Sequence, residues 1–316
     1  MHTIGVDIGG TKIAAGVVDD EGRILAQTRR ETQPEDPASI DAAIASVYAE
    51  LSAQHPVAAV GVAAAGFVSA DRATMLFAPN IAWRDYPLRG KVQALIGEHV
   101  PVVVENDANA AGWAEFRFGA ARDVDDMVTL TLGTGLGGAI VSGGRLVRGW
   151  AGVAAEIGHM RVVPFGHHCG CGHQGCWEQY VSGSALVRDA QAAAIARPAE
   201  ATRLLELAGG TVEGIDGPLV TRAAQGGDAL AIELLAEVGR WVGEGAASVA
   251  ALLDPALFVI GGGVSAAGDL VLQPALTAFA RQLSARGHRP EAPIVIAAMG
   301  NDAGIVGAAD LARVEV

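Results

Sequence analysis

The stretch VDIGGTKIAAGVVDDEGRIL, residues 6–25, decides the fold. Its two apolar runs are separated by a Gly-Gly-Thr-Lys turn at residues 9–12, which is typical of a β-hairpin. The stretch LTLGTGLGGAIVSGGRLV, residues 130–147, repeats the same order of apolar runs, glycines and arginine. Unless two glycine-rich turns are similar by chance, the pair predicts two related lobes, each opened by such a hairpin, with a cleft between them.

The rest of the chain alternates between two kinds of pattern, which predicts an α/β fold. Short β-branched runs that end in Gly, Asn or Asp predict buried strands, at residues 3–8, 59–62, 101–104, 127–132 and 257–260. Longer helical patterns occupy residues 39–54, 108–118, 183–196 and 229–253. We expect a small lobe of residues 1–108, onto which residues 302–316 pack back, and a large lobe of residues 109–301.

The composition favours a globular protein that acts on a small molecule. With 316 residues, the chain has the length of about two domains. Hydrophobic residues make up 51% and charged residues 18%, which excludes a disordered chain. The net charge of −13 argues against a nucleic-acid partner, which needs a basic surface. Because we find no secretion signal and no apolar run of about 20 residues, we expect a cytoplasmic protein without a membrane partner.

Three glycine-rich turns are candidates for binding a nucleotide. In the first, backbone N–H groups of Gly9 and Gly10 can approach an anion, while Thr11 and Lys12 add a hydroxyl group and a positive charge. Asp7 is suited to hold Mg²⁺ through water, although an ordinary hairpin turn explains the same residues. The other two turns follow predicted strands, and they are LGTGLGG at residues 132–138 and GGGV at residues 261–264.

The segment ENDAN, residues 105–109, carries a candidate catalytic acid. Asn106 and Asp107 stand where a predicted strand ends and a helix begins, and ligands of α/β sheets bind beyond such strand ends. Asp107 can accept the proton of a hydroxyl group during phosphoryl transfer. From this segment alone, however, a helix cap is the favoured interpretation, because Asn and Asp are common caps.

All three cysteines of the chain lie in CGCGHQGC, residues 169–176, which indicates a metal site. Three thiolates and one imidazole would complete a closed structural Zn²⁺ site, whereas the alternative is a set of free thiols. Glu156 and Glu178 bracket the cluster and are either acceptors for sugar hydroxyl groups or solvated surface residues. The residues alone do not choose among four candidate imidazole ligands, which are His159, His167, His168 and His173.

Together these motifs resemble the ROK family of repressors and sugar kinases, and within it the glucokinases of actinobacterial type. The resemblance covers nearly the whole chain. It is carried by DIGGTK at residues 7–12, ENDANAA at 105–111, LGTGLGGAIVSGGRLVRG at 132–149, AAEIGH at 154–159, CGCGHQGCWEQYVSG at 169–183 and DAGIVGAA at 302–309.

The resemblance implies an actin-like (ribonuclease-H-like) ATPase fold and transfer of the γ-phosphoryl group of ATP-Mg²⁺ to the 6-hydroxyl of glucose. It implies that Asp107 is the general base, reversing the preference for a cap, and that the protein forms a homodimer or homotetramer. The sugar would be held by Gly66, Asn106, Asp107, Glu156, His159 and Glu178. Phosphates would be bound by Gly9, Gly10, Thr11, Lys12, Thr134 and Gly135, with Mg²⁺ at Asp7 and adenosine near Gly262 and Gly263. Structural zinc would be held by His159, Cys169, Cys171 and Cys176.

Several alternatives remain open at this point. The same pocket motifs would serve a kinase for N-acetylglucosamine, mannose or fructose, or a glucokinase that uses polyphosphate. A sugar-sensing repressor is disfavoured, since the first hairpin begins at residue 3 and we expect no helix-turn-helix ahead of it. A zinc-containing interaction module would leave Asp107 and the phosphate turns without a use.

Overall fold

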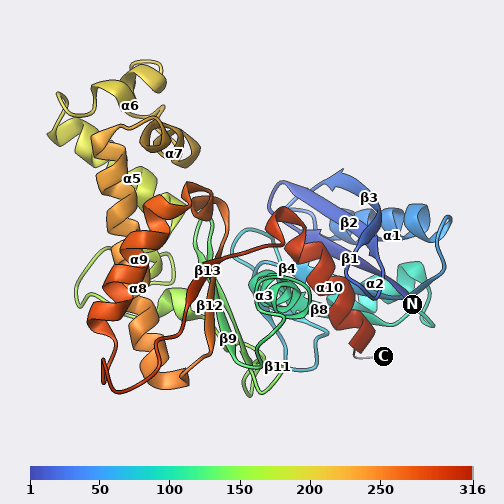
Figure 1. The fold of residues 1–316 in the computed structure, drawn as a ribbon. Coiled ribbons are helices and arrows are strands. Elements are labelled where there is room, and N and C mark those ends of the chain that lie inside the picture. The colour runs from blue at the N-terminus through green and yellow to red at the C-terminus, as the bar shows by residue number, and fades with distance from the viewer. Residues whose placement is uncertain (315–316) are drawn as a thin grey trace. The chain divides into compact units, whose positions relative to one another are not determined.

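The computed structural model describes residues 1–314 and is a mixed α/β structure (Figure 1). The chain divides into two compact units. The first consists of Met1–Asp125, Ala139–Ala155 and Ala298–Val316, of which residues 315–316 lie outside the described part. The second consists of Asp126–Gly138 and Glu156–Ala297.

The first sheet has the strand order β3-β2-β1-β4-β8. The strands are β1 (His2–Ile8), β2 (Lys12–Val18), β3 (Ile24–Glu31), β4 (Val57–Ala64) and β8 (Val102–Asn106). β1, β2 and β3 form an antiparallel meander, whereas β4 is parallel to both β1 and β8. In the register of the parallel strands, Asp7 and Glu105 both pair with Ala63. The carboxyl ends of β1, β4 and β8 therefore meet at one edge of the sheet.

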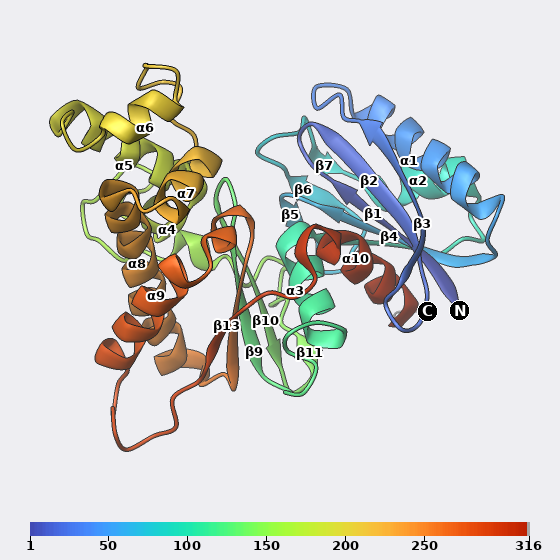
Figure 2. The same ribbon diagram turned by 45° about the horizontal axis from the view of Figure 1, so that its top comes forward.

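Two pairs of helices enclose this sheet (Figure 2). The helices α1 (Pro37–Ser52) and α2 (Leu88–Ile96) pack on the face that carries Ile4 and Val6. The helices α3 (Asp107–Arg117) and α10 (Ala303–Val314) pack against each other, and α10 covers the opposite face. A small sheet of β5 (Phe67–Val68), β6 (Met75–Phe77) and β7 (Arg84–Tyr86) completes the first unit.

The contact of α10 with the sheet depends on glycine. A Cβ atom added at Gly5 would overlap with the carbonyl oxygen of Ile305, and one added at Gly61 would overlap with that of Ala308. Since neighbouring β1 and β4 both lack a side chain here, the backbone of α10 lies directly on the sheet. This is close packing of a kind that tolerates no larger residue.

The second sheet repeats the topology of the first, with the order β11-β10-β9-β12-β13. Its strands are β9 (Met127–Leu132), β10 (Leu136–Ser142), β11 (Arg145–Leu146), β12 (Leu257–Gly261) and β13 (Ile294–Ile296). Again a hairpin strand pair comes first, and β12 then pairs in parallel with both β9 and β13. The structure thus confirms that the two similar stretches of sequence form equivalent parts of two sheets.

Residues 139–146 of β10 and β11 belong to the first unit, and helices make up most of the second unit beside β9, β12 and β13. The long helix α8 (Ala229–Leu253) packs along α9 (Asp269–Gln282) (Figure 1). The others are α4 (Glu178–Val181), α5 (Gly183–Ala196), α6 (Thr202–Leu207) and α7 (Gly217–Gln225). Short 3₁₀ turns lie at Ile157–His159 (η1) and Gly263–Ala267 (η2) of this unit, while Gly300–Asp302 (η3) belongs to the first unit and precedes α10. Among the described residues, no helix is long and apolar enough to cross a membrane.

The structure confirms the five predicted strands and four predicted helices, most with shifts of one or two residues at their ends. Three agree to the residue: β9, α5 and α8. Among the elements that the sequence did not predict are α2, α4, α6, α7, β13 and the small sheet. The strands of that sheet are too short to show a period. The lobe boundary at residues 108 and 109 stays a prediction, and the compact units follow a different division because α3 packs on α10.

Candidate active site and metal centre

Two carboxyl groups lie at the edge where the parallel strands of the first sheet end. Asp7 is near the end of β1, and Asp107 is the first residue of α3, directly after β8. Burial raises the pKa of Asp7 to about 6, with a further contribution from the negative charge of Asp107, while Lys12 opposes the shift. Burial also raises the pKa of Asp107. Two such carboxyl groups favour the approach of a proton or a cation.

The helix cap at this strand end is Asn106 and not Asp107. The Asn106 Oδ1 atom accepts a hydrogen bond of 3.0 Å from the backbone N–H of Asn109. Its Nδ2 atom donates one of 3.1 Å to the carbonyl oxygen of Gly66. The Oδ1 atom of Asp107 accepts from the N–H of the neighbouring Ala108, at 2.9 Å. Because Asn106 supplies the cap, the carboxyl group of Asp107 is not needed as one.

Gly66 occupies a position that only glycine suits. Its φ of 141° is outside the range that other residues readily adopt. A Cβ atom there would overlap with the carbonyl oxygen of Phe77. The hydrogen bond from Asn106 therefore joins a constrained loop to the strand end that carries Asp107.

The first glycine-rich turn connects β1 to β2 and presents polar groups to solvent. The N–H of Gly9 donates to the carbonyl oxygen of Lys12 at 2.9 Å, and the Thr32 hydroxyl donates to that of Gly9 at 2.9 Å. Gly10, Thr11 and Lys12 are exposed. Exposed N–H, hydroxyl and ammonium groups beside a carboxylate suit a phosphate group with its metal ion.

Asp7 itself lies against the start of α10. A Cβ atom added at Gly304 would be 2.8 Å from the Cγ atom of Asp7. The positive end of the helix dipole at this place favours negative charge and opposes part of the cost of burial.

The other two glycine-rich turns come together at the edge of the second sheet. Gly261 at the end of β12 pairs with Thr131 of β9. A Cβ atom at Gly262, where φ is 82°, would be 2.5 Å from the carbonyl oxygen of Leu132. The N–H of Gly183, which begins α5, donates to the carbonyl oxygen of Gly133 at 2.8 Å. Residues 133–135 and 262–263 thus lie beside each other and beside a helix N-terminus, where anions bind.

Glu178 connects the second glycine-rich turn to the cysteine cluster. Its Oε2 atom accepts a hydrogen bond of 3.0 Å from the backbone N–H of Leu136, which follows Gly135. Its Oε1 atom is 3.8 Å from the Sγ atom of Cys169. Glu156, in contrast, is exposed and precedes η1, where its carbonyl oxygen accepts from the N–H of His159 at 3.1 Å.

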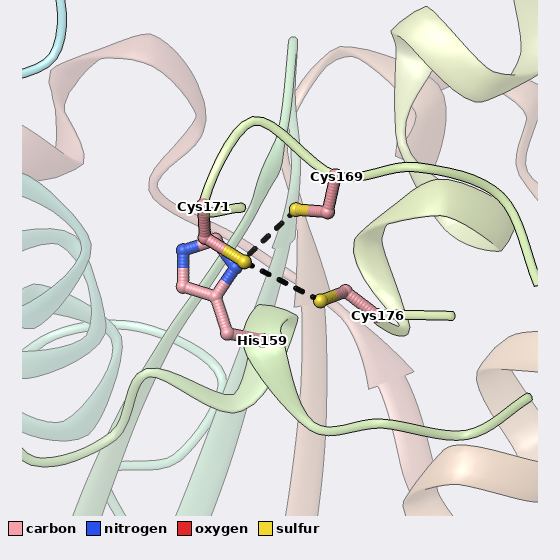
Figure 3. Close-up of side chains that lie close together, drawn as sticks. All are labelled: His159, Cys169, Cys171 and Cys176. Carbon is pink, nitrogen blue, oxygen red and sulfur yellow. Dashed lines mark hydrogen bonds between the residues drawn. The ribbon is translucent and has the colours of Figure 1, made fainter. Parts of the chain in front are cut away.

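The structure brings three thiols and one imidazole into one cluster, consisting of His159, Cys169, Cys171 and Cys176 (Figure 3). The candidate ligand atoms all lie within 4.8 Å of one another, and the cysteines form no disulfide. The Sγ atoms of Cys171 and Cys176 are 3.6 Å apart, and Cys169 Sγ is 3.7 Å from His159 Nδ1. Tetrahedral bonds of about 2.3 Å to zinc separate neighbouring sulfur ligands by about 3.8 Å. The donor set and its spacing therefore fit Zn²⁺.

Backbone hydrogen bonds stabilise the loop that carries these ligands. Cys169 N–H donates to the carbonyl oxygen of His173 at 2.9 Å, and Gly175 N–H to that of His167 at 2.8 Å. The side chain of His168 lies 3.0 Å from that of Gln174. Of the four candidate histidines, only His159 belongs to the cluster found among the described residues.

Comparison with known proteins places this arrangement in a family. A model of the ROK family matches residues 3–315. The chain belongs to the ROK family. The expected fold class is confirmed, since a solved ROK structure superposes over almost the whole chain.

Three ROK or sugar-kinase relatives illustrate the similarity. A glucokinase of Streptomyces coelicolor is 53% identical over 311 residues, which cover 98% of this chain and 97% of the relative. The crystal structure of a ROK family glucokinase from Streptomyces griseus in complex with glucose and AMPPNP has a TM-score of 0.89 and 55% identity, with 99% of each chain covered. A ROK hexokinase from Thermus thermophilus has a TM-score of 0.83 and 36% identity, with 100% of this chain and 99% of that chain covered.

Sequence reasoning missed one group of residues in this ROK chain. Glu105 is buried beside Asn106 and forms ion pairs with Arg72 and Arg148. The sequence does contain a signal for this group, which is a carboxylate at the end of an apolar strand. A charge that is buried there requires an oppositely charged partner. The sequence did not identify the two arginines, since both are distant from Glu105 along the chain.

Proposed function

We propose that this ROK protein transfers the γ-phosphoryl group of ATP to the 6-hydroxyl of glucose. The observation that carries the proposal is the position of Asp107. Asn106 caps the helix in its place, and Asp107 lies near Asp7 at the edge where the parallel strands end. The glucokinase relatives, which cover nearly the whole chain, support the same reaction.

In the proposed reaction, Asp107 is the general base. Its carboxylate takes the proton of the 6-hydroxyl while the hydroxyl oxygen forms a bond to the γ-phosphorus, and the bond from that phosphorus to the ADP oxygen breaks. The raised pKa of Asp107 makes it a better proton acceptor than an ordinary aspartate. Most of the remaining rate enhancement comes from positioning and electrostatics.

The nucleotide is proposed to use the glycine-rich turns. Mg²⁺, held through water at Asp7, would neutralise charge on the phosphates. The exposure of Gly10, Thr11 and Lys12 supports phosphate binding by the first turn, in which Gly9 would shape the backbone through its N–H bond to Lys12. In the second turn, the exposure of Thr134 supports phosphate binding by Thr134 and its neighbour Gly135. The contact of Gly262 with Leu132 supports adenosine binding near Gly262 and Gly263.

The sugar is proposed to contact polar groups from several loops. The candidates are Gly66, Asn106, Glu156, His159 and Glu178, in addition to Asp107. A structural Zn²⁺ would be held by His159, Cys169, Cys171 and Cys176, whose spacing fits it. We also propose a cytoplasmic location, where ATP is supplied, and a homodimer or homotetramer.

The test is release of ADP by purified, zinc-loaded protein with ATP-Mg²⁺ over a panel of hexoses, with Asp107→Ala as the inactive control. We expect the highest kcat/KM with glucose and a loss of about 10³-fold or more in the variant. Faster turnover with mannose, fructose or N-acetylglucosamine would change the substrate, and faster turnover with polyphosphate would change the donor. No sugar-dependent release by folded protein would overturn the proposal.

A further inference from the structure

The buried carboxylate of Glu105 joins three segments of the first unit. Glu105 ends the apolar part of β8 and is 1% exposed. Its Oε1 atom accepts hydrogen bonds from the backbone N–H of Asn106 at 2.9 Å and from the Nδ2 atom of Asn109 at 3.0 Å. Its Oε2 atom forms ion pairs with the Nε atoms of Arg72 at 3.2 Å and Arg148 at 2.8 Å.

Both arginines also hold the turn that follows β5. The guanidinium of Arg148 donates to the carbonyl oxygens of Ser69 at 3.0 Å and Ala70 at 2.8 Å. Arg72 adopts a φ of 56°, which is unusual for a residue other than glycine. Its carbonyl oxygen accepts from the N–H of Val104 in β8 at 3.1 Å. Backbone strain of this kind persists only where the surroundings enforce it.

Each of the joined segments is next to a candidate sugar ligand along the chain. Asn106 and Asp107 follow Glu105 directly. The turn follows the loop of Gly66, whose carbonyl oxygen accepts from Asn106. The third segment runs from Arg148 to Ala155 and precedes Glu156, and its Gly152 packs so closely that a Cβ atom would overlap with the carbonyl oxygen of Val68.

We propose that Glu105 is a positioning residue that fixes the general base Asp107 relative to the sugar-binding loops of the first unit. The proposal rests on the proposed function. The side chains of Arg72 and Arg148 are 13% and 11% exposed, so without the carboxylate two mostly buried cations would face each other. We expect the turn and the segment after Arg148 then to move away from β8, and Asp107 to lose its alignment with the sugar hydroxyl.

The test compares Glu105→Gln with Asp310→Asn, a control of the same chemistry. Asp310 is also 1% exposed and lies between two arginines, Arg117 at 3.1 Å and Arg313 at 2.6 Å. It lies on α10, outside the proposed sugar site. Both variants should lower the melting temperature. At saturating glucose and ATP, we expect kcat to fall about 10- to 100-fold in Glu105→Gln and less than about twofold in Asp310→Asn, with KM for ATP unchanged in both.

Hydrogen–deuterium exchange of the same variants gives a second readout that does not depend on catalysis. Glu105→Gln should speed exchange of amides in residues 66–74 and 106–110, and Asp310→Asn should not. If the wild-type protein transfers no phosphoryl group, the proposed function fails, and exchange still decides whether Glu105 holds these loops. If Glu105→Gln does not fold, Arg148→Lys is used instead, which keeps the charge but loses the paired carbonyl contacts. Unchanged kcat and unchanged local exchange in the folded variant, or equal kcat losses in both variants, would overturn the proposal.

Discussion

At the scale of single residues, Asp7 and Asp107 are two buried carboxyl groups at one edge of the first sheet. Both carboxyl groups have a raised pKa because burial disfavours their charged forms, and Asp7 is affected further by the charge of Asp107. Because these buried groups lose their protons as pH rises, the metal-free protein is less stable near neutral pH than at acidic pH. In the proposed enzyme the bound cation would compensate for this cost.

Replacing Asp7 by Asn should therefore stabilise the metal-free protein. In the folded state the pKa of Asp7 is about 6 instead of 3.8, so the folded state binds more protons between these values. The unfolding free energy then falls as pH rises from about 4 to about 6, by ~2 kcal/mol, and the deficit persists above pH 6. Asp7→Asn should remove this deficit and be more stable at pH 7.5, as measured by urea unfolding at several pH values. A variant that is less stable at pH 7.5 would contradict the raised pKa.

The pH dependence of kcat should report the same pair of carboxyl groups. Asp107 acts as a base only when ionised, and its pKa is raised by burial. We expect kcat to increase with pH along an acidic limb whose apparent pKa lies above the ordinary aspartate value of about 4. Steady-state rates at saturating glucose and ATP between pH 4.5 and pH 8 measure it. A flat profile over this range would show that no raised carboxyl pKa controls the reaction.

At the scale of elements, one face of the first sheet is covered by α10, which packs on glycines of β1 and β4. Gly61→Ala should destabilise the protein by about 3 kcal/mol or prevent folding, since the new methyl group would overlap with the carbonyl oxygen of Ala308. Gly90→Ala in α2 is the matched control, because a Cβ atom there has no neighbour within 4 Å and alanine favours helix. Thermal unfolding of both variants is the measurement. Equal melting temperatures would contradict the packing of α10.

The cysteine loop is an element that we expect to depend on its metal. Cys176→Ser should lose zinc and unfold at a temperature several degrees lower, because a buried thiolate ligand is removed. His173→Ala should keep zinc, since His173 is not part of the cluster. Metal analysis by mass spectrometry, together with the melting temperature, measures both effects. Loss of zinc from His173→Ala with retention in His159→Ala would contradict the assigned ligand set.

Much of this organisation could be predicted from local sequence. The two hairpin stretches have strong periodicity and turn residues, so both the strands and their equivalence can be recognised from the amino-acid pattern. The cysteine cluster is visible because its ligands are close in sequence. The ion pairs of Glu105 are not, because Arg72 and Arg148 reach it only after the sheet has formed. The same reason hides the contact of Asn106 with Gly66, which joins separate loops, whereas the helix cap that Asn106 forms with Asn109 is local and could be predicted.

At the scale of the whole molecule, two sheets of equal topology each carry their candidate ligands at the carboxyl ends of parallel strands. In the first sheet these are Asp7 and Asp107, and in the second they are the glycine-rich turns beside α5. This repetition explains why most site residues lie in short motifs at the ends of strands. The net charge of −13 is consistent with a substrate that is small and arrives with a cation.

The most direct test of the central claim is the position at which the sugar is phosphorylated. Zinc-loaded protein is incubated with ATP-Mg²⁺ and glucose labelled with ¹³C at carbon 6, and the product is examined by ³¹P and ¹³C NMR. We predict a phosphorus–carbon coupling at carbon 6, with no such product from Asp107→Ala. Phosphate on another hydroxyl group, or unphosphorylated glucose in the presence of folded wild-type protein, would contradict the account.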